Sequence, residues 1–157
     1  YGPTSAWSRG AAWAIYGFAN SYRYTKDERF LAAAKKTADF FLRHLPDDLV
    51  PPWDFRAPED QIWAKDSTAA ACAASGMLEI AALSGLDDGE RYRSAGEAIL
   101  KSLYENYTPE DPSEEALIVK GTGSFPSGYE VETPIIYGDF FFVEGIAKLR
   151  GNKEVFW

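Results

Sequence analysis

The chain has 157 residues, enough for one domain that buries roughly 70% of the surface exposed by its unfolded form. Acidic residues outnumber basic ones by 24 to 16, which gives a net charge of −8. Because the sequence also has no basic run, we do not expect it to bind nucleic acid through phosphate contacts. Aromatic residues make up 15% of the chain, and this high share favours a site that stacks flat apolar surfaces.

The sequence shows no membrane span and no signal peptide, so we expect no membrane partner; the redox compartment stays open, with a cytoplasmic location favoured. Cys72 is the only cysteine and lies in an apolar run, which predicts a buried small hydrophobe and excludes an intrachain disulfide. The chain begins with Tyr1 and not with Met, so we interpret it as a processed or truncated product.

The first two predicted elements are helices. The segment from Ser8 to Tyr22 is apolar on most of its faces, which predicts a buried helix. From Glu28 to His44, apolar residues recur at helical spacing on one face and charged residues lie on the other, which predicts an amphipathic surface helix. Four prolines between residues 46 and 58 then predict a long loop that carries Trp53, Asp54, Phe55 and Trp63.

A second buried helix is predicted over 67–83, since Asp66 and Ser67 form a typical helix start before a run of small apolar residues. A turn at 85–89 leads into a second amphipathic helix from Glu90 to Tyr104. Residues 107–136 predict a functional or flexible loop, with a small hairpin between 117–119 and 131–136. A third buried helix is predicted from Tyr137 to Leu149.

A short signature of glutamate followed by an aromatic residue two positions later recurs three times, as Glu28-Arg29-Phe30, Glu90-Arg91-Tyr92 and Glu154-Val155-Phe156. Such a period indicates repeated supersecondary units. The alternation of buried and surface helices is typical of an α/α toroid, an all-α fold in which an outer ring of helices covers an inner ring. Since two and a half helical hairpins do not close a ring of six, we expect only about half of the ring in this chain.

The segment Trp7-Ser8-Arg9-Gly10-Ala11-Ala12-Trp13 carries the strongest candidate site. On a helix, Arg9 and Trp13 project from the same face, and Trp7 adds a second wall. A guanidinium group binds a carboxylate with two hydrogen bonds while an indole stacks on a sugar ring, so this pattern predicts a site for an acidic sugar. The alternative is that Arg9 pairs with a buried carboxylate at the axial mouth of the ring and that the tryptophans are core.

Three aspartates are further candidates. Asp66 is interpreted as the cap of the following helix, with catalysis as the alternative. Asp54 lies between two aromatic residues, where desolvation raises a carboxyl pKa, or it orients Lys65 or Arg56. Asp139 stands at a predicted helix start, where its charge is favourably placed for the helix dipole; it is interpreted as a cap, with a functional role as the alternative.

We expect no metal and no cofactor. His44 is the only histidine and ends a helix, which excludes a histidine-based metal site or a Ser-His-Asp triad within this chain. The run from Gly121 to Ser124 lacks the lysine and the following helix of a phosphate-binding loop.

Four collinear blocks resemble the unsaturated glucuronyl hydrolases, glycoside hydrolase family 88. They are Trp7 to Phe18, Pro52-Trp53-Asp54-Phe55 with Ala57-Pro58, Lys65-Asp66-Ser67 with Ala74-Ser75-Gly76, and Ile136-Tyr137-Gly138-Asp139 with two phenylalanines. The blocks cover nearly the whole chain in the family's order. The resemblance implies an (α/α)6 toroid that releases 4,5-unsaturated uronic acid from the non-reducing end of lyase-generated oligosaccharides.

In that family an aspartate protonates the vinyl ether, water adds across the double bond, and the resulting hemiketal collapses. The resemblance places the catalytic aspartates in the first half of the family's chain, so residues 1–157 correspond to the C-terminal portion, and no catalytic residue is carried over. It implies that Arg9 and Trp13 contact the sugar and that the loop at 121–136, with Tyr129, shapes the leaving-group subsite. The expected partners are unsaturated uronic-acid oligosaccharides and the missing N-terminal segment.

The sequence leaves three alternatives open. The unsaturated rhamnogalacturonyl hydrolases are also α/α toroids, although the Trp53-Asp54-Phe55 loop argues for the glucuronyl group. A non-catalytic fragment that binds acidic sugars is the second alternative. The third is an interaction module whose apolar open edges contact another protein.

Overall fold

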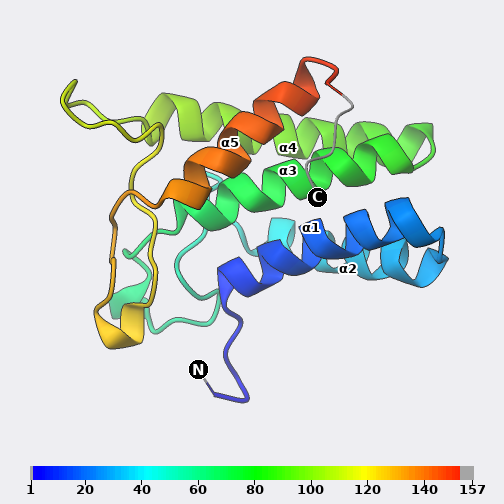
Figure 1. Cartoon of the computed structure of the whole chain (residues 1–157). Coiled ribbons are helices and arrows are strands. Elements are labelled where there is room, and N and C mark those ends of the chain that lie inside the picture. Colours follow the sequence, from blue (N-terminus) through cyan, green and yellow to red (C-terminus); the bar gives the residue numbers. More distant parts are fainter. Residues whose placement is uncertain (1, 153–157) are drawn as a thin grey trace.

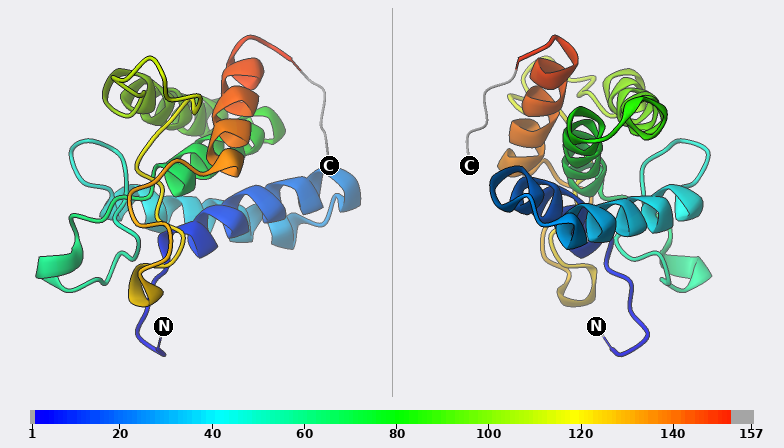
Figure 2. Two further views of the ribbon diagram at one scale, coloured as in Figure 1. Left: turned by 60° about the vertical axis from the view of Figure 1, so that its left-hand side comes forward. Right: turned by 90° about the vertical axis from the view of Figure 1, so that its right-hand side faces the viewer.

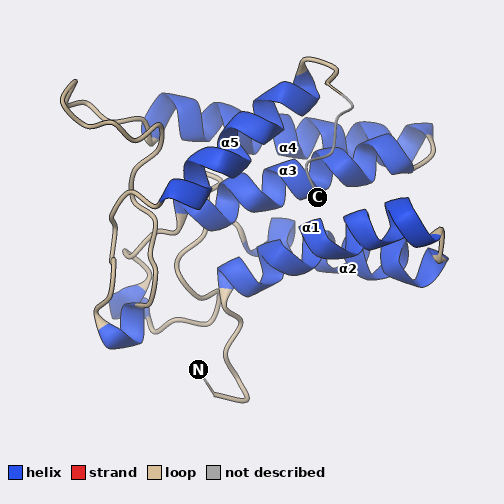
Figure 3. Cartoon of the chain, viewed as in Figure 1, coloured by secondary structure: helices blue, strands red, loops and turns tan. Residues whose placement is uncertain are grey.

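The computed structural model describes residues 2–152, and the regular secondary structure within that range is entirely helical. Five α-helices and two short 3₁₀ helices follow one another along the chain (Figures 1 and 3). The α-helices are α1 (Ser8–Thr25), α2 (Glu28–His44), α3 (Ser67–Leu83), α4 (Leu86–Asn106) and α5 (Ile136–Leu149). The 3₁₀ helices are η1 (Glu59–Gln61) and η2 (Phe125–Ser127). The all-α prediction is therefore confirmed.

The helices form two rows. The inner row contains α1, α3 and α5, whereas α2 and α4 lie on the outer side (Figure 2). Helix α3 packs against α1, α4 and α5, and α2 packs against α1. Each inner helix except α5 is thus followed by an outer one, which is the alternation that the sequence predicted for an arc of an α/α toroid.

Helix α3 is the centre of the core, and its small side chains explain why. Residues 67–80 are buried on every face of the helix, and the free Cys72 lies among them, as predicted. Gly76 lets α1 approach closely, because a Cβ atom at this position would lie 2.9 Å from the backbone N and Cα of Tyr16. The run of alanines therefore does more than favour a helix, since it allows three neighbouring helices to pack around α3.

Helices α1 and α5 differ from the prediction that they are buried on most faces. Helix α1 leaves Trp13 47% exposed and Tyr24 65% exposed, and α5 leaves Ile136 80% and Val143 50% exposed. Helix α1 packs against α2 and α3, and α5 packs against α3 and less extensively against α4, so one side of each helix stays exposed within the described part of the chain. The prediction of burial on all faces is correct for α3 and wrong for α1 and α5, the two ends of the arc.

The repeated signature lies on the two outer helices. Glu28 begins α2, whereas Glu90 lies within α4, which begins earlier than predicted, at Leu86. Asp87 and Asp88 stand in the first turn of α4, where acidic side chains interact favourably with the helix dipole, so a segment predicted as a turn is helical. The third copy, at residues 154–156, lies outside the described residues.

The small hairpin predicted between 117–119 and 131–136 is wrong. The loop instead forms two isolated antiparallel bridges, one between Gly121 and Thr133 and one between Ser124 and Tyr129. The upstream segment, residues 117–119, makes other contacts. The amide of Ile118 donates to Asp139 Oδ1 at 3.0 Å, and the amide of Val119 donates to a carbonyl at the end of a helix. Residues 117–119 therefore fasten the loop to the helices and do not pair with 131–136.

The long loops at 45–66 and 107–135 lie at one end of the arc, beside the first turns of α1, α3 and α5 (Figure 1). All three inner helices begin at this end, and the short turns between hairpin helices lie at the other. The N-termini of the inner helices and the two decorated loops consequently surround the same region, which contains the candidate site.

Candidate functional site

The first turns of the three inner helices meet at the Arg9 side chain. Arg9 comes from the first turn of α1, Asp66 directly precedes α3, and Tyr137 lies in the first turn of α5. Arg9 donates from Nε and Nη2 to Asp66 Oδ2, at 3.1 and 2.9 Å, and from Nη1 to the Tyr137 hydroxyl at 2.6 Å. Arg9 Nη2 also donates to the carbonyl of Thr122 in the long loop. One guanidinium group thus joins three helices and a loop.

The charged pair at this point is deeply buried. Arg9 is 3% exposed and Asp66 is fully buried, so each compensates for the desolvation of the other. Burial raises the pKa of the Asp66 carboxyl, while Arg9 and the amide of Ala69 counteract part of that rise. The predicted cap is confirmed, because Asp66 Oδ1 accepts a hydrogen bond from the Ala69 amide at 3.2 Å.

Arg9 therefore forms the pairing described by the alternative interpretation, with a carboxylate at the axial mouth. The tryptophans do not follow that interpretation, since Trp13 is 47% exposed. A guanidinium group has five N–H donors, and the four bonds to Asp66, Tyr137 and Thr122 leave one Nη1 hydrogen. Contact between Arg9 and a sugar is not tested by this geometry and stays a prediction.

Aromatic side chains cover the cation. Trp7 and Trp13 pack edge to face, with ring centroids 5.0 Å apart. The guanidinium carbon of Arg9 lies 5.8 Å from the ring centroid of Trp7 and 5.4 Å from that of Tyr137. Tyr137 is 36% exposed and Tyr129 is 60% exposed. The region therefore presents flat apolar faces to the outside above a buried positive charge, a combination suited to an anionic ring.

The loop that carries Tyr129 is held by an aromatic anchor. Phe125 stacks on Trp53, with centroids 5.2 Å apart and planes 13° apart, and packs its edge against Trp63 at 5.7 Å. The loop turns back at Gly128, which has a positive φ of 66°. The two long loops are thereby fixed to each other, although they are about 70 residues apart in the sequence.

Polar contacts reinforce the same attachment. The Thr122 hydroxyl donates to the Lys65 carbonyl at 2.6 Å, and the Lys65 amide donates to Glu132 Oε1 at 3.3 Å. A hydrogen bond to Glu130 raises the pKa of Tyr129, and the electrostatic effect of Tyr137 raises it further. Tyr129 and Tyr137 therefore belong to one surface region, on the loop and on α5.

Asp54 anchors the first residues of the chain and does not orient either predicted side chain. It is 2% exposed and accepts hydrogen bonds from Ser5 Oγ, from the Ala6 amide at 3.0 Å and from the Arg56 amide at 2.8 Å. Lys65 Nζ instead binds Asp48 at 2.9 Å, and the Arg56 guanidinium group donates to a backbone carbonyl. The prediction that Asp54 orients Lys65 or the Arg56 side chain is therefore wrong.

The predicted capping role of Asp139 is also wrong, whereas its predicted placement near the positive end of the helix dipole is confirmed. The residue at the N-cap of α5 is Ile135, which makes no side-chain capping bond. Asp139 lies in the first turn, where its charge interacts favourably with the helix dipole, and it accepts from the amide of Ile118 in the preceding loop. Asp139 thus positions the loop relative to α5.

A second cluster of buried polar side chains, which was not predicted from the sequence, lies between the inner helices. Glu144 on α5 accepts hydrogen bonds from Tyr16 on α1, at 2.8 Å, from Ser75 on α3, and from Lys148, at 3.3 Å. Lys148 also lies 3.6 Å from Glu79, which pairs with Arg23. The available signal was the presence of Glu79 and Glu144, which are 2% and 3% exposed, in helices predicted as buried.

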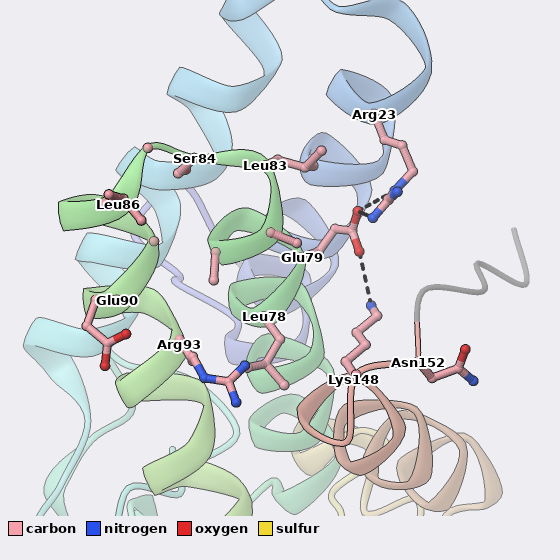
Figure 4. A pocket seen from close by; sticks show the side chains of 15 residues that line it. Arg23, Leu78, Glu79, Leu83, Ser84, Leu86, Glu90, Arg93, Lys148 and Asn152 are labelled. Atoms are coloured by element: carbon pink, nitrogen blue, oxygen red, sulfur yellow. Dashed lines mark hydrogen bonds and ion pairs between the residues drawn. The ribbon is translucent and has the colours of Figure 1, made fainter.

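This cluster borders a hollow of about 500 Å³ at the end of the arc opposite Arg9 (Figure 4). Arg23, Glu79 and Lys148 line it together with the start of α4. The hollow is larger than a second one, of about 300 Å³, that lies beside Asp54 in the loop region. The larger volume of this hollow does not identify it as the functional site. Arg23 and Lys148, which line it, already share Glu79 as a counter-ion.

None of the helices within residues 2–152 is long and apolar enough to cross a membrane.

No model of a protein family matches the sequence. An unsaturated glucuronyl hydrolase of Formosa agariphila is 37% identical over 148 residues, which cover 92% of this chain and 36% of that protein. The crystal structure of an unsaturated glucuronyl hydrolase from Bacillus sp. GL1 superposes with a TM-score of 0.89 and 34% identity, over 94% of this chain and 40% of that one.

A mutant of the unsaturated glucuronyl hydrolase of Streptococcus agalactiae, solved in complex with dGlcA-GalNAc6S, superposes with a TM-score of 0.92 and 32% identity. The match covers 100% of this chain and 42% of that one. This chain thus spans 36% to 42% of the length of these three relatives. Sequence and fold together confirm the resemblance: the chain belongs to the family of the unsaturated glucuronyl hydrolases.

Proposed function

We propose that this chain is the C-terminal portion of a glycoside hydrolase that releases 4,5-unsaturated uronic acid from the non-reducing end of lyase-generated oligosaccharides. The observation that carries the proposal is the convergence of three inner-helix N-termini on Arg9, below an exposed aromatic surface. The family relatives support it, because one of them is solved with a dGlcA-containing disaccharide.

The proposed binding roles follow from charge and exposure. Arg9 supplies the positive potential that attracts the uronate carboxylate. Trp13, which is half exposed, stacks on the sugar ring, and Trp7 holds the Trp13 indole through its edge-to-face contact. Tyr129 extends from the long loop toward the leaving-group side.

The proton donor of the reaction is proposed to lie outside this chain. The two buried aspartates near the site are occupied, Asp54 by backbone amides and Asp66 by Arg9 and the start of α3. In the proposed reaction an aspartate protonates one carbon of the vinyl ether, and a water molecule adds to the neighbouring carbon that bears the ring oxygen. The resulting hemiketal opens to a ketone and leaves a hemiacetal at the anomeric carbon, which expels the sugar alcohol and becomes an aldehyde. This sequence differs from ordinary glycoside hydrolysis, in which the proton goes to the leaving oxygen.

The exposed apolar residues of α1 and α5 are consistent with a missing segment. We propose that the rest of the ring packs there, because Phe18 on α1 and Val143 on α5 are at least 36% exposed on inner-row helices. A fragment that binds acidic sugars without cleaving them would present the same surface. An assay of the reaction itself separates these two functions.

The test is an assay of the full-length protein that contains this chain, with an unsaturated uronate disaccharide. Loss of the absorbance of the uronate double bond is the expected result, and Trp13→Ala is expected to raise KM by roughly 10-fold or more. Tyr104→Ala is a matched control, because Tyr104 is an exposed aromatic residue on the outer helix α4. Binding of the disaccharide without loss of absorbance would reject the hydrolase function and leave a binding function.

A further inference from the structure

Within the described residues, Tyr137 is the polar group of the Arg9 cluster that is exposed to solvent and also contacts the buried guanidinium group. Arg9 and Asp66 are nearly inaccessible, at 3% and 0% exposure, whereas Tyr137 is 36% exposed. A ligand that approaches the cluster therefore reaches Tyr137 before it reaches the buried pair. This ordering was not evident from the sequence, which pointed to Arg9 itself.

The hydrogen bond between Arg9 and Tyr137 fixes the direction of the Tyr137 hydroxyl. Arg9 Nη1 is the donor at 2.6 Å, since an arginine has no acceptor, so the Tyr137 oxygen accepts. A hydroxyl that accepts from Arg9 keeps its own hydrogen for a second partner. Within the described residues, the hydrogen bonds of this cluster assign no acceptor to that hydrogen.

The cation also strengthens Tyr137 as a donor. A hydroxyl that accepts from a charged group is polarised, and hydrogen bonds in such a chain reinforce one another. The guanidinium carbon lies 5.4 Å from the centre of the Tyr137 ring, so the positive charge stays next to the phenol. An anion that accepts from this hydroxyl would be stabilised by the phenol and by Arg9 behind it.

The position of Tyr137 fits the proposed ligand. The guanidinium carbon of Arg9 lies within 6 Å of the ring centroids of both Trp7 and Tyr137, so a sugar ring stacked on the tryptophan pair can direct a carboxylate to Tyr137. The first turn of α5 adds the positive end of a helix dipole at the same place.

We propose that the Tyr137 hydroxyl donates directly to the carboxylate of the unsaturated uronate, with Arg9 as the positioning and polarising residue behind it. This inference rests on the proposed function. It makes Tyr137 on α5, and not the buried Arg9, the residue that contacts the carboxylate directly.

The test compares two substrates in the full-length protein, the unsaturated uronate disaccharide and its methyl ester, which lacks the charge. Tyr137→Phe removes the hydroxyl and keeps the ring above Arg9. We expect the variant to raise KM for the free acid on the order of 10- to 100-fold and to change KM for the ester far less. Tyr104→Phe, a matched change on α4, is expected to leave both KM values unchanged.

Each result has a separate meaning. An equal rise of KM for acid and ester, or no rise for either, would reject the carboxylate contact, even if the wild type is active. A wild type that neither binds nor cleaves the disaccharide would reject the proposed function itself. Since KM does not depend on the fraction of folded enzyme, the acid-to-ester comparison remains decisive if Tyr137→Phe lowers the yield of active protein.

Discussion

Arg9 directs two of its N–H groups at a single oxygen of Asp66, and the other Asp66 oxygen accepts from the Ala69 amide at the start of α3. One aspartate thus holds a helix terminus and a cation of the candidate site at the same time. The geometry of the site and the stability of the fold consequently depend on the same pair. A substitution there changes both, so binding and unfolding have to be measured together.

Arg9→Ala is expected to lower the free energy of unfolding by about 3–5 kcal/mol, because it leaves the carboxylate of Asp66 buried without a counter-ion. Urea unfolding followed by circular dichroism measures the change. Arg29→Ala, which removes the exposed partner of Asp27, is the matched control and should leave stability nearly unchanged. Equal, small effects of both changes would contradict the importance of burial at Arg9.

Gly76→Ala is expected to destabilise the protein by about 1–3 kcal/mol, since the added methyl group would lie 2.9 Å from the backbone of Tyr16 on α1. Gly17→Ala is the matched control within a helix, because a Cβ atom there meets nothing within 4 Å. Its expected effect is a gain of roughly 0.5–1 kcal/mol from helix propensity. Thermal unfolding of both variants checks the pair, and a stabilised Gly76→Ala would show that α1 and α3 are not in close contact.

The helices and the alternation of rows could be predicted from the sequence, because apolar spacing decides which faces are buried. The exposed sides of α1 and α5 could not, since Trp13 and Val143 are apolar whether or not a neighbouring helix covers them. The local spacing of apolar residues indicates which contacts a residue is suited to make. It does not report whether that contact is made within this stretch of chain.

The candidate site was predicted in part. The motif around Arg9 identified the cation and both tryptophans, and the helix start identified Asp66 as a cap. That these two residues pair, and that Tyr137 joins them, depends on contacts over 57 and 128 positions, which no local motif encodes. The Asp54 and Asp139 predictions failed for a related reason, because the carboxylates bind backbone amides of distant segments whose positions follow from the fold.

Lys148→Met should destabilise the protein strongly, by about 3–5 kcal/mol, because Lys148 lies beside two glutamates that are 2% and 3% exposed. The remaining cation, Arg23, contacts only Glu79 of the two. Adding Glu144→Gln to Lys148→Met should restore part of the loss, since it removes one of the uncompensated charges. Denaturant titration of the single and double variants measures this coupling, and a double variant no more stable than the single one would contradict it.

Phe125→Ala is expected to loosen the loop that carries Tyr129, because it removes the stacking contact with Trp53 and the edge contact with Trp63. Hydrogen exchange should become faster at the amides of Gly123 and Ser124, which pair across the loop. Leu117→Ala, at a 45% exposed position earlier in the same connection, is the control and should leave those amides unchanged. Unchanged exchange in Phe125→Ala would mean that the backbone pairs alone hold the loop.

Asp48 provides the pH dependence that the structure predicts most clearly. Burial acts to raise the pKa of Asp48, but hydrogen bonds from Lys65, Tyr107 and the Val50 amide outweigh it and hold the pKa below its ordinary value. A carboxyl group whose pKa is lower in the folded state stabilises the protein above its unfolded pKa. That contribution is lost as the pH falls through the folded value.

Asp48→Asn is therefore expected to lower the melting temperature near neutral pH and to differ progressively less from the wild type as the pH falls below about 4. Melting curves recorded from neutral to acidic pH measure the difference directly. Asp47→Asn, at the exposed neighbouring position, serves as the control and should show little difference at any pH. A gap between wild type and Asp48→Asn that stays constant on acidification would show that the carboxylate charge of Asp48 does not stabilise the attachment of the loop through Lys65 and Tyr107.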